Sequence, residues 1–304
     1  MSEPAISIQR LSKSYGHVQA VQSLDLTVQQ GEVFGFLGPN GAGKTTTIRC
    51  LLGLIHPQQG EIRVLGLDPR RAPTEVRARC GYLPGELNVD DNMTVKDVLR
   101  YFISLRGAGV KWETAQQIAD RLDLDLSRQV KNLSKGNKQK VGLVQALMHA
   151  PQILLLDEPT SGLDPLVQQS VLEMVAEARQ AGATVFFSSH ILSEVQAIAG
   201  RVGIIRQGSL VEVANTEDLL QRSLRRLRLR FASTVDPAGL LAIPGVTLVA
   251  QSAPNILHLE VAGEMDALVK ALGNYPVQDL ETERPSLEEI FLAYYREKET
   301  TAAK

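Results

Sequence analysis

Short apolar runs separated by turns dominate the first part of the chain. Runs suited to β-strands occur at residues 5–11, 24–28, 33–37 and 61–64. A glycine-rich segment starts at Gly38, and the residues after it carry apolar side chains at helical spacing, at Ile48, Leu51, Leu52 and Ile55. The pattern predicts several strands, with one helix between the last two of them.

The middle of the chain alternates helical and strand patterns. Helical spacing runs from residue 94 to about 126, and Thr94 with Asp97 is typical of a helix start. Asp164 and Pro165 are typical of a cap and first turn, and that helix should end at Gly182. Further helices are expected at 138–148 and 191–199, and further strands at 153–156, 184–188 and 202–206. Such alternation predicts an α/β fold with a largely parallel sheet covered on both faces, to which the β-rich start and the helical middle are added as subdomains.

The character of the chain changes after about residue 220. Strand patterns occur at 227–231, 246–249 and 256–261, and helical patterns at 264–272 and 286–296, the last one opened by the capping box of Ser286 and Glu289. The sequence therefore predicts two domains. Residues 1–220 form the larger one, with a helical subdomain at about 86–150, and residues 221–304 form a small α+β accessory domain.

Composition excludes several classes of protein. The 304 residues are 44% hydrophobic and 22% charged, as in ordinary globular proteins and unlike disordered or fibrous ones. No apolar run approaches the roughly 18 residues of a membrane helix. The first residues lack an apolar signal core, and Cys50 and Cys80 cannot form a disulfide framework, so we expect a reduced, cytoplasmic protein.

A nucleic-acid-binding role is weakly supported. The net charge is −2, and the local basic stretch alternates with leucine at period two, as on a half-buried strand with its arginines in solvent. No aromatic residues are interleaved with these arginines for base stacking. The stretch contains Arg222, Arg225, Arg226, Arg228 and Arg230.

The glycine-rich segment fits the P-loop pattern G-x-x-x-x-G-K-[ST], and it lies between a predicted strand and a predicted helix. Its glycines let backbone amides surround phosphate oxygens, and the helix N-terminus adds partial positive charge. The lysine would reach the β- and γ-phosphates, and the first threonine would bind Mg²⁺. The nucleotide-binding candidates are Gly38, Asn40, Gly41, Gly43, Lys44, Thr45 and Thr46.

Two adjacent carboxylates follow the apolar strand at 153–156. Asp157 is the expected second ligand of Mg²⁺, because ligands of α/β sheets bind at the carboxyl ends of the strands. Glu158, one residue further, is placed to polarise a water beyond the γ-phosphate as a general base. The pair together with the P-loop predicts a nucleoside triphosphate hydrolase.

Residues 133–137 read Leu-Ser-Lys-Gly-Asn, and with Gln139 they resemble the signature sequence of ABC-type ATPases. The order of motifs extends the resemblance from about residue 4 to 215. It implies adenine stacking on Tyr15, a D-loop at 161–164 that ends in Asp164, and a switch histidine at His190. The bound nucleotide is then ATP with Mg²⁺. Ser134, Gly136 and Asn137, expected just before the helix at 138–148, would form a second anion-binding helix N-terminus.

In such ATPases the signature covers the γ-phosphate bound by another subunit. The resemblance therefore implies a head-to-tail dimer of two copies of this chain around two ATP molecules, which closes on ATP binding and opens after hydrolysis.

Three positions depart from the usual family pattern. Lys135 and Asn137 stand where the signature has glycine and glutamine, and we expect its function to be retained. The usual Q-loop glutamine should follow Pro84, but Gly85 and Glu86 stand there, so Glu86 is a candidate contact of Mg²⁺ or its water.

No long insertion separates Lys44 from Ser134, which excludes the coiled-coil branches of the superfamily. The strings at 81–86, 133–137 and 285–291 resemble the drug- and antibiotic-resistance branch of bacterial exporter ATPases. That resemblance implies a motor on the inner face of the cell membrane. It would bind a separate polytopic permease through the cleft near residues 82–98 and the helical subdomain, and the permease would export a drug-like, lipid or peptide substrate. A soluble ABC ATPase without a membrane partner is the alternative, and phosphotransfer to a small molecule ranks lowest.

Overall fold

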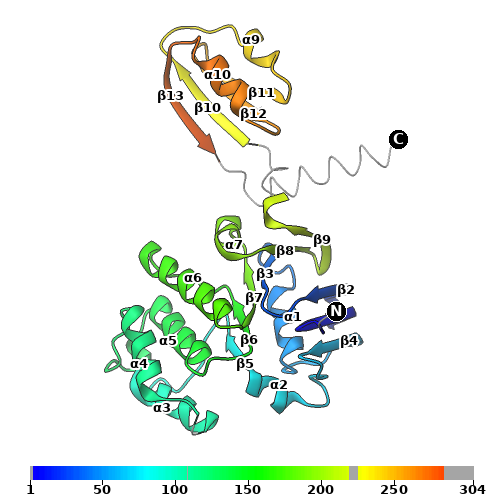
Figure 1. Ribbon diagram of the computed structural model, residues 1–304, viewed down its shortest axis with the longest axis vertical. Helices are drawn as coiled ribbons and strands as arrows, with labels where there is room; N and C mark the ends of the chain where they lie inside the picture. The colour runs from blue at the N-terminus through cyan, green and yellow to red at the C-terminus, as the bar shows by residue number, and fades with distance from the viewer. Residues whose placement is uncertain (1–2, 108, 219–224, 284–304) are drawn as a thin grey trace. The chain divides into compact units, whose positions relative to one another are not determined.

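The computed structural model describes residues 3–107, 109–218 and 225–283. The chain divides into two compact units, Met1–Thr216 and Glu217–Lys304. Each unit is built around its own sheet or sheets, as the ribbon shows (Figure 1). Within the described ranges, no helix has the length and apolar character that crossing a membrane requires.

A six-stranded sheet forms the centre of the first unit. The central strands are continuous buried apolar runs, as expected where helices cover both faces. Neighbouring strands pair in parallel except at the last edge, where the final pair is antiparallel. This confirms the predicted largely parallel sheet. Its strand order is β5 (Cys80–Leu83), β6 (Ile153–Asp157), β7 (Thr184–Ser189), β3 (Val33–Leu37), β8 (Arg201–Arg206) and β9 (Ser209–Asn215).

The predicted β-rich start forms a separate antiparallel sheet. It contains β2 (Val18–Val28), β1 (Ile6–Tyr15) and β4 (Gln59–Val64) in that order. The apolar run at 5–11 is only the first half of β1, which continues to Tyr15 while it stays paired with β2. Strand pairing thus extends β1 beyond its apolar pattern.

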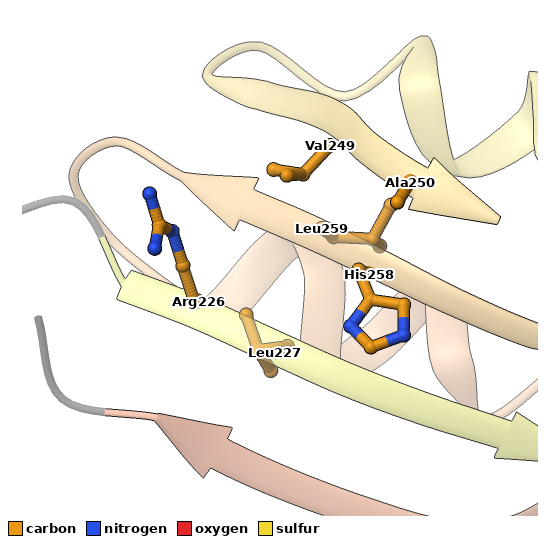
Figure 2. Close-up of a pocket in the computed structure, with 6 residues that line it drawn as sticks. All are labelled: Arg226, Leu227, Val249, Ala250, His258 and Leu259. Carbon is orange, nitrogen blue, oxygen red and sulfur yellow. The ribbon is translucent and has the colours of Figure 1, made fainter. Parts of the chain in front are cut away.

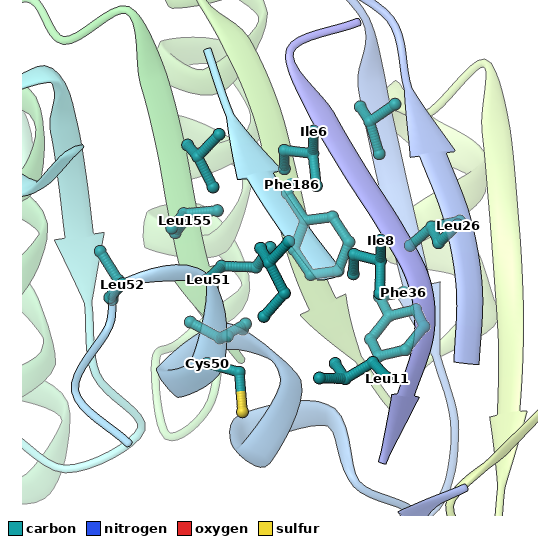
Figure 3. Packing of buried hydrophobic residues seen from close by; sticks show 14 of the residues in the cluster. Ile6, Ile8, Leu11, Leu26, Phe36, Cys50, Leu51, Leu52, Leu155 and Phe186 are labelled. Carbon is teal, nitrogen blue, oxygen red and sulfur yellow. The ribbon is translucent and has the colours of Figure 1, made fainter. Parts of the chain in front are cut away.

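One hydrophobic core fixes this sheet to the central one and to the helix α1 (Lys44–Leu51). Figure 3 shows Ile8 and Leu11 of β1, Phe36 of β3, Leu51 of α1 and Phe186 of β7 gathered in that core. All five side chains are fully buried. The start of α1 is therefore held in place from both sheets.

The helical subdomain differs in its boundaries from the sequence prediction. The pattern at 94–126 is two helices, α3 (Val95–Arg106) and α4 (Trp112–Arg121), because the chain leaves helical geometry at Gly107, where φ is 84°. The next helix, α5 (Lys135–Leu147), begins three residues earlier than expected, because the Ser134 side chain caps it. These three helices lie together on one side of the first unit (Figure 1).

The remaining helices described in the first unit lie next to strands of the central sheet in the sequence: one leads from β4 of the antiparallel sheet into β5, and two connect strands of the central sheet. They are α2 (Pro73–Arg79), α6 (Pro165–Gln180) and α7 (Leu192–Ile198). The predicted start of α6 is confirmed, since the Asp164 carboxylate accepts a hydrogen bond from the Val167 N–H at 3.1 Å.

The second unit is a split β-α-β-β-α-β fold. Its four antiparallel strands lie in the order β11-β12-β10-β13, and two of its connections are helical. The predicted helix at 286–296 lies outside the described residues. The elements are β10 (Arg225–Phe231), α9 (Ala238–Leu241), β11 (Val246–Ala253), β12 (Ile256–Val261), α10 (Asp266–Leu272) and β13 (Val277–Glu283).

The period-two pattern of β10 separates its two faces. Its leucines and Phe231 are buried in the core of the unit. On the other face Arg226, Arg228 and Arg230 form ion pairs with carboxylates of β12 and β13. This sheet also lines a cavity of about 180 Å³ beside Val249 and His258 (Figure 2). The arginines thus serve cross-strand pairing within this sheet.

Candidate functional site

Two glycines of the predicted P-loop lie where no side chain fits. The loop leaves the buried strand β3 at Gly38 and enters α1 at Lys44. A Cβ on Gly38 would lie 2.4 Å from the Ile205 carbonyl oxygen, and one on Gly43, whose φ is 109°, would lie 2.4 Å from the Ala20 carbonyl oxygen. Glycine at these positions lets the loop pass close to β8 and β2.

Gly41 has the opposite surroundings. Its φ is 79°, and a Cβ placed on it would meet nothing within 4 Å. The space beside Gly41, near the N-terminus of α1, is therefore open. Backbone N–H groups and the helix dipole favour negative charge there, so we expect the phosphate concavity of the loop at this position. These residues fit the phosphate groups of a nucleotide.

Lys44 is directed into this loop. Its side chain is 5% exposed, and its ammonium group donates to the carbonyl oxygens of Gly38 at 2.6 Å and Pro39 at 3.2 Å. The same nitrogen lies 3.3 Å from a carboxylate oxygen of Glu158. The positively charged ammonium group of Lys44 thus lies between the P-loop and the end of β6.

Asp157 ends β6 and is 2% exposed. Its carboxylate accepts hydrogen bonds from the Thr45 hydroxyl at 2.6 Å and from the Ser188 hydroxyl of β7 at 2.6 Å. Mg²⁺ prefers such oxygen ligands and is commonly held by one or two carboxylates together with substrate phosphates. The adjacent hydroxyl and carboxylate of Thr45 and Asp157 fit that cation.

Glu158 has strained backbone geometry. Its φ is 51°, in the left-handed region that non-glycine residues rarely adopt. Its N–H donates to the Ser188 carbonyl and hydroxyl oxygens at 3.2 and 3.1 Å, and its carbonyl oxygen accepts from the Gln139 amide at 2.9 Å. This bend turns the carboxylate toward Lys44 and toward His190, whose Nδ1 lies 3.4 Å from it.

The signature residues lie at the start of α5. The Ser134 hydroxyl accepts a hydrogen bond from the Asn137 N–H at 3.2 Å, so Gly136 and Asn137 belong to the first helical turn, not to the segment before it. A Cβ on Gly136 would lie 2.5 Å from the Gly162 carbonyl oxygen. The helix start therefore packs against the predicted D-loop of the same chain.

Two predicted contacts stand apart from this cluster. Tyr15 ends β1 and is 46% exposed, with the Lys13 ammonium group 5.3 Å from its ring centroid. Glu86 is exposed, and among the described residues no contact joins it to Thr45 or Asp157. Gly85 occupies the nearby position, since its Cβ would lie 3.3 Å from Asp157 Oδ2. The structure thus brings Gly85, and not the Glu86 carboxylate, next to Asp157.

Tyr82 of β5 lies near the same carboxylate. Burial raises the pKa of its phenol, and the negative charge of Asp157 raises it further. Arg49 acts in the opposite direction through a hydrogen bond and its charge. Tyr82 is therefore a neutral polar neighbour of the site at physiological pH.

The sequence analysis did not identify Ser188 as part of the site. In the parallel sheet, Asp157 of β6 pairs in register with Ser188 of β7. The strand order that makes them neighbours is not encoded in either strand pattern. The signal available was a serine at the end of an apolar run, which on its own indicates nothing beyond a strand end.

Comparison with known proteins agrees with this geometry. Residues 21–161 match the ABC transporter family, and residues 217–295 match a family described as "ATP-binding protein DrrA1-3-like, C-terminal domain". The chain is 33% identical to the daunorubicin resistance ATP-binding protein DrrA3 of Streptomyces coeruleorubidus, over 96% of both chains. It is 36% identical to the bacitracin transport ATP-binding protein BcrA of Bacillus licheniformis, over 73% of each.

A solved structure of the ATP-binding subunit of an ABC transporter superposes with a TM-score of 0.65 at 28% identity, covering 71% of this chain and 91% of that one. The fold and the site define a P-loop ATPase with a signature helix. The chain belongs to the ATP-binding proteins of ABC transporters. It is an enzyme that binds and hydrolyses ATP.

Proposed function

We propose that this chain is the motor of an exporter that moves a drug-like, lipid or peptide substrate through a separate membrane permease. The observation that carries the proposal is the joint placement of Lys44, Glu158 and His190 beside the Thr45–Asp157 pair. The direction and class of transport are supported by the relatives, whose names state daunorubicin resistance and bacitracin transport.

Each residue of the cluster has a task in hydrolysis. The N–H groups of the P-loop and Lys44 hold the phosphates, and Thr45 with Asp157 would hold Mg²⁺. The cation, when bound, neutralises charge on the phosphate oxygens. Glu158 accepts a proton from the attacking water as general base. His190, 3.4 Å from Glu158, orients that carboxylate and contacts the γ-phosphate side of the site.

A second copy of the chain completes each site in this proposal. Ser134, Gly136 and Asn137 of one copy would contact the γ-phosphate held by the other, because the N-terminus of a helix carries partial positive charge that favours an anion. Tyr15 would stack on adenine, since its ring is half exposed at the end of β1. Asp164 would act mainly through the cap of α6, which holds the D-loop next to the signature residues.

The motor would bind the inner face of the membrane through its permease. The expected docking region runs from residue 82 to 98, between β5 and the start of α3. The soluble-ATPase alternative shares every motif and differs only in its partners. A direct search for partners therefore separates the two.

The experiment is a pull-down of tagged Glu158→Gln protein from gently solubilised host membranes with ATP and Mg²⁺. This variant lacks the base, so it should stay in the ATP-bound form and recover a polytopic membrane protein. Lys44→Ala is the matched control, because it should bind ATP poorly and recover much less of that protein. Recovery of soluble partners alone would contradict the transporter assignment and favour the soluble ATPase.

A further inference from the structure

Glu194 is a buried carboxylate that the hydrolytic site described above does not use. It lies in the first turn of α7 and is 8% exposed. One of its oxygens accepts a hydrogen bond from the Thr160 hydroxyl, and the other accepts one from the Ser189 hydroxyl at 2.6 Å. Its two hydrogen-bond partners thus come from two different segments that border the site.

The Ser189 side of this contact shapes the turn that carries His190. The Ser189 oxygen accepts a hydrogen bond from the Ile191 N–H at 2.9 Å, which closes a tight turn with His190 between the two residues. Glu194 fixes the orientation of that hydroxyl by accepting its hydrogen bond. A change at Glu194 would therefore affect the position of His190 through one intermediate side chain, that of Ser189.

The Thr160 side shapes the predicted D-loop. Along this segment the Ser161 N–H donates to the Glu158 carbonyl oxygen at 3.1 Å, and the Leu163 N–H donates to the Thr160 carbonyl oxygen at 3.2 Å. Gly162, between them, packs against Gly136 of the signature helix. Glu194 thus connects the turn of His190 to the loop that contacts the signature.

The environment of Glu194 is unusual for a purely structural carboxylate. Among the residues that the structure describes, no cation forms an ion pair with it, and its partners are neutral hydroxyls. Burying a carboxylate without a cation is costly, and two hydroxyl donors offset only part of that cost. An apolar residue in its place would avoid this cost, but it would leave the Thr160 hydroxyl without this acceptor and the Ser189 hydroxyl with only the Ile191 carbonyl oxygen at 3.3 Å.

We propose that Glu194 is a positioning residue that sets the geometry of His190 and of the D-loop relative to each other. The proposal rests on the roles assigned to Glu158 and His190 above. In this account, Glu194 touches no substrate atom and acts on hydrolysis only through Ser189 and Thr160. ATP binding should depend little on it, because Lys44 and the P-loop make no contact with Glu194 in the described structure.

Three substitutions at position 194 separate the effects of side-chain charge, side-chain length and hydrogen bonding. Glu194→Ala removes both acceptors, and Glu194→Asp keeps the charge but is one methylene too short to reach both hydroxyls. Glu194→Gln keeps the reach; its oxygen accepts from one hydroxyl and its NH₂ donates to the other. The Ser189 hydroxyl can then turn its proton to the Ile191 carbonyl oxygen, 3.3 Å away.

We expect kcat for ATP hydrolysis to fall at least tenfold in Glu194→Ala and Glu194→Asp, and to return to within about threefold of the parent in Glu194→Gln. The Kd for ATP should stay within about twofold in all three variants. Asp68→Ala is the matched control, because Asp68 is also 8% exposed but pairs with Arg70 away from this cluster. It should lower the melting temperature and leave kcat unchanged.

A double-mutant cycle then tests the route through His190. Residues that act as a unit are non-additive, so Glu194→Ala should change kcat by a smaller factor when added to His190→Ala than in the parent, and the remaining effect is the part that acts through Thr160. The proposal is wrong if Glu194→Ala keeps the parent kcat, or if its full effect persists both in His190→Ala and in Thr160→Val. A parent-like kcat of His190→Ala would refute the role of His190 instead, and the same cycle with Thr160→Val would then decide whether Glu194 acts through the D-loop.

Discussion

At the scale of single residues, the site depends on backbone positions as much as on side chains. Gly38 and Gly43 allow the loop to approach neighbouring strands, whereas Gly41 leaves open the space that a phosphate needs. Glu158 adopts a left-handed φ that turns its carboxylate toward Lys44 and His190. Backbone strain of about 1–3 kcal/mol at such a residue persists only where its surroundings hold it, here two hydrogen bonds to Ser188.

Gly41→Ala tests the phosphate concavity. The added Cβ meets no atom within 4 Å, so the variant should fold, with the roughly 1 kcal/mol cost of a positive φ. Its ATP affinity should fall at least tenfold, because the methyl group occupies the concavity. Equilibrium nucleotide binding and thermal melting measure the two effects.

The control for that variant is Gly182→Ala. Gly182 also has a positive φ, 99°, and open surroundings, but it follows α6 at the opposite end from the D-loop. It should show a similar loss of stability with unchanged ATP affinity. Equal loss of affinity in both variants would mean that strain, and not the filled concavity, weakens binding.

Sequence reasoning identified single residues unevenly. Lys44, Thr45, Asp157 and Glu158 could be predicted because each lies at a fixed distance from a strand end in its own segment. The pairing of Asp157 with Ser188, and the contacts of Glu194, depend on which strands are neighbours. Glu86 was expected near the cation by position along the chain, but the chain turns at Gly85 and leaves the carboxylate exposed.

At the scale of elements, helix and strand types followed the apolar pattern, and their ends followed local capping. Ser134 starts α5 three residues before its apolar stripe, and Gly107 divides the helical pattern that follows Thr94. Strands β5 and β9 were not predicted. β5 has only four residues, and β9 shows no alternation because its residues are all partly or fully exposed. Their pairing to β6 and β8, not their sequence, makes them strands.

The end of α5 carries a pH-sensitive contact. His149 Nε2 lies 3.2 Å from the Cys80 carbonyl oxygen, close to Arg106. Burial, and to a smaller extent the charge of Arg106, lower the pKa of His149 to about 4. The unfolded chain, with an ordinary histidine pKa of about 6.5, therefore binds the proton first as the pH falls.

The stability that neutral His149 contributes should be fully present above pH 6.5 and should be lost as the pH falls toward 4. Between pH 7.5 and 5 we expect the free energy of unfolding to fall by about 1 kcal/mol, a figure that already includes a reduction for solvent screening of the partly buried ring. His149→Gln should lose that much less over the same interval in urea denaturation, and the exposed His17→Gln should behave as the parent. An unchanged pH dependence in His149→Gln would contradict this account.

At the scale of the whole molecule, two units with separate cores share one chain. The first unit holds all the proposed catalytic groups, and in the part of the chain that the structure describes no hydrogen bond or ion pair joins Ser134, Gly136 or Asn137 to Lys44. The sequence motifs predicted that the start of this helix completes the site of a second copy of the chain. The physical basis of that prediction is the partial positive charge at the N-terminus of α5, which favours an anion.

The most direct test is the molar mass of Glu158→Gln protein in solution, measured by light scattering with Mg²⁺ and either ATP or ADP. The account predicts a dimer with ATP and a monomer with ADP, because only the γ-phosphate joins the two copies. Ser134→Arg in the same background should stay monomeric with ATP while it still binds the nucleotide. A Glu158→Gln protein that binds ATP and remains a monomer at every protein concentration would contradict the shared-site mechanism.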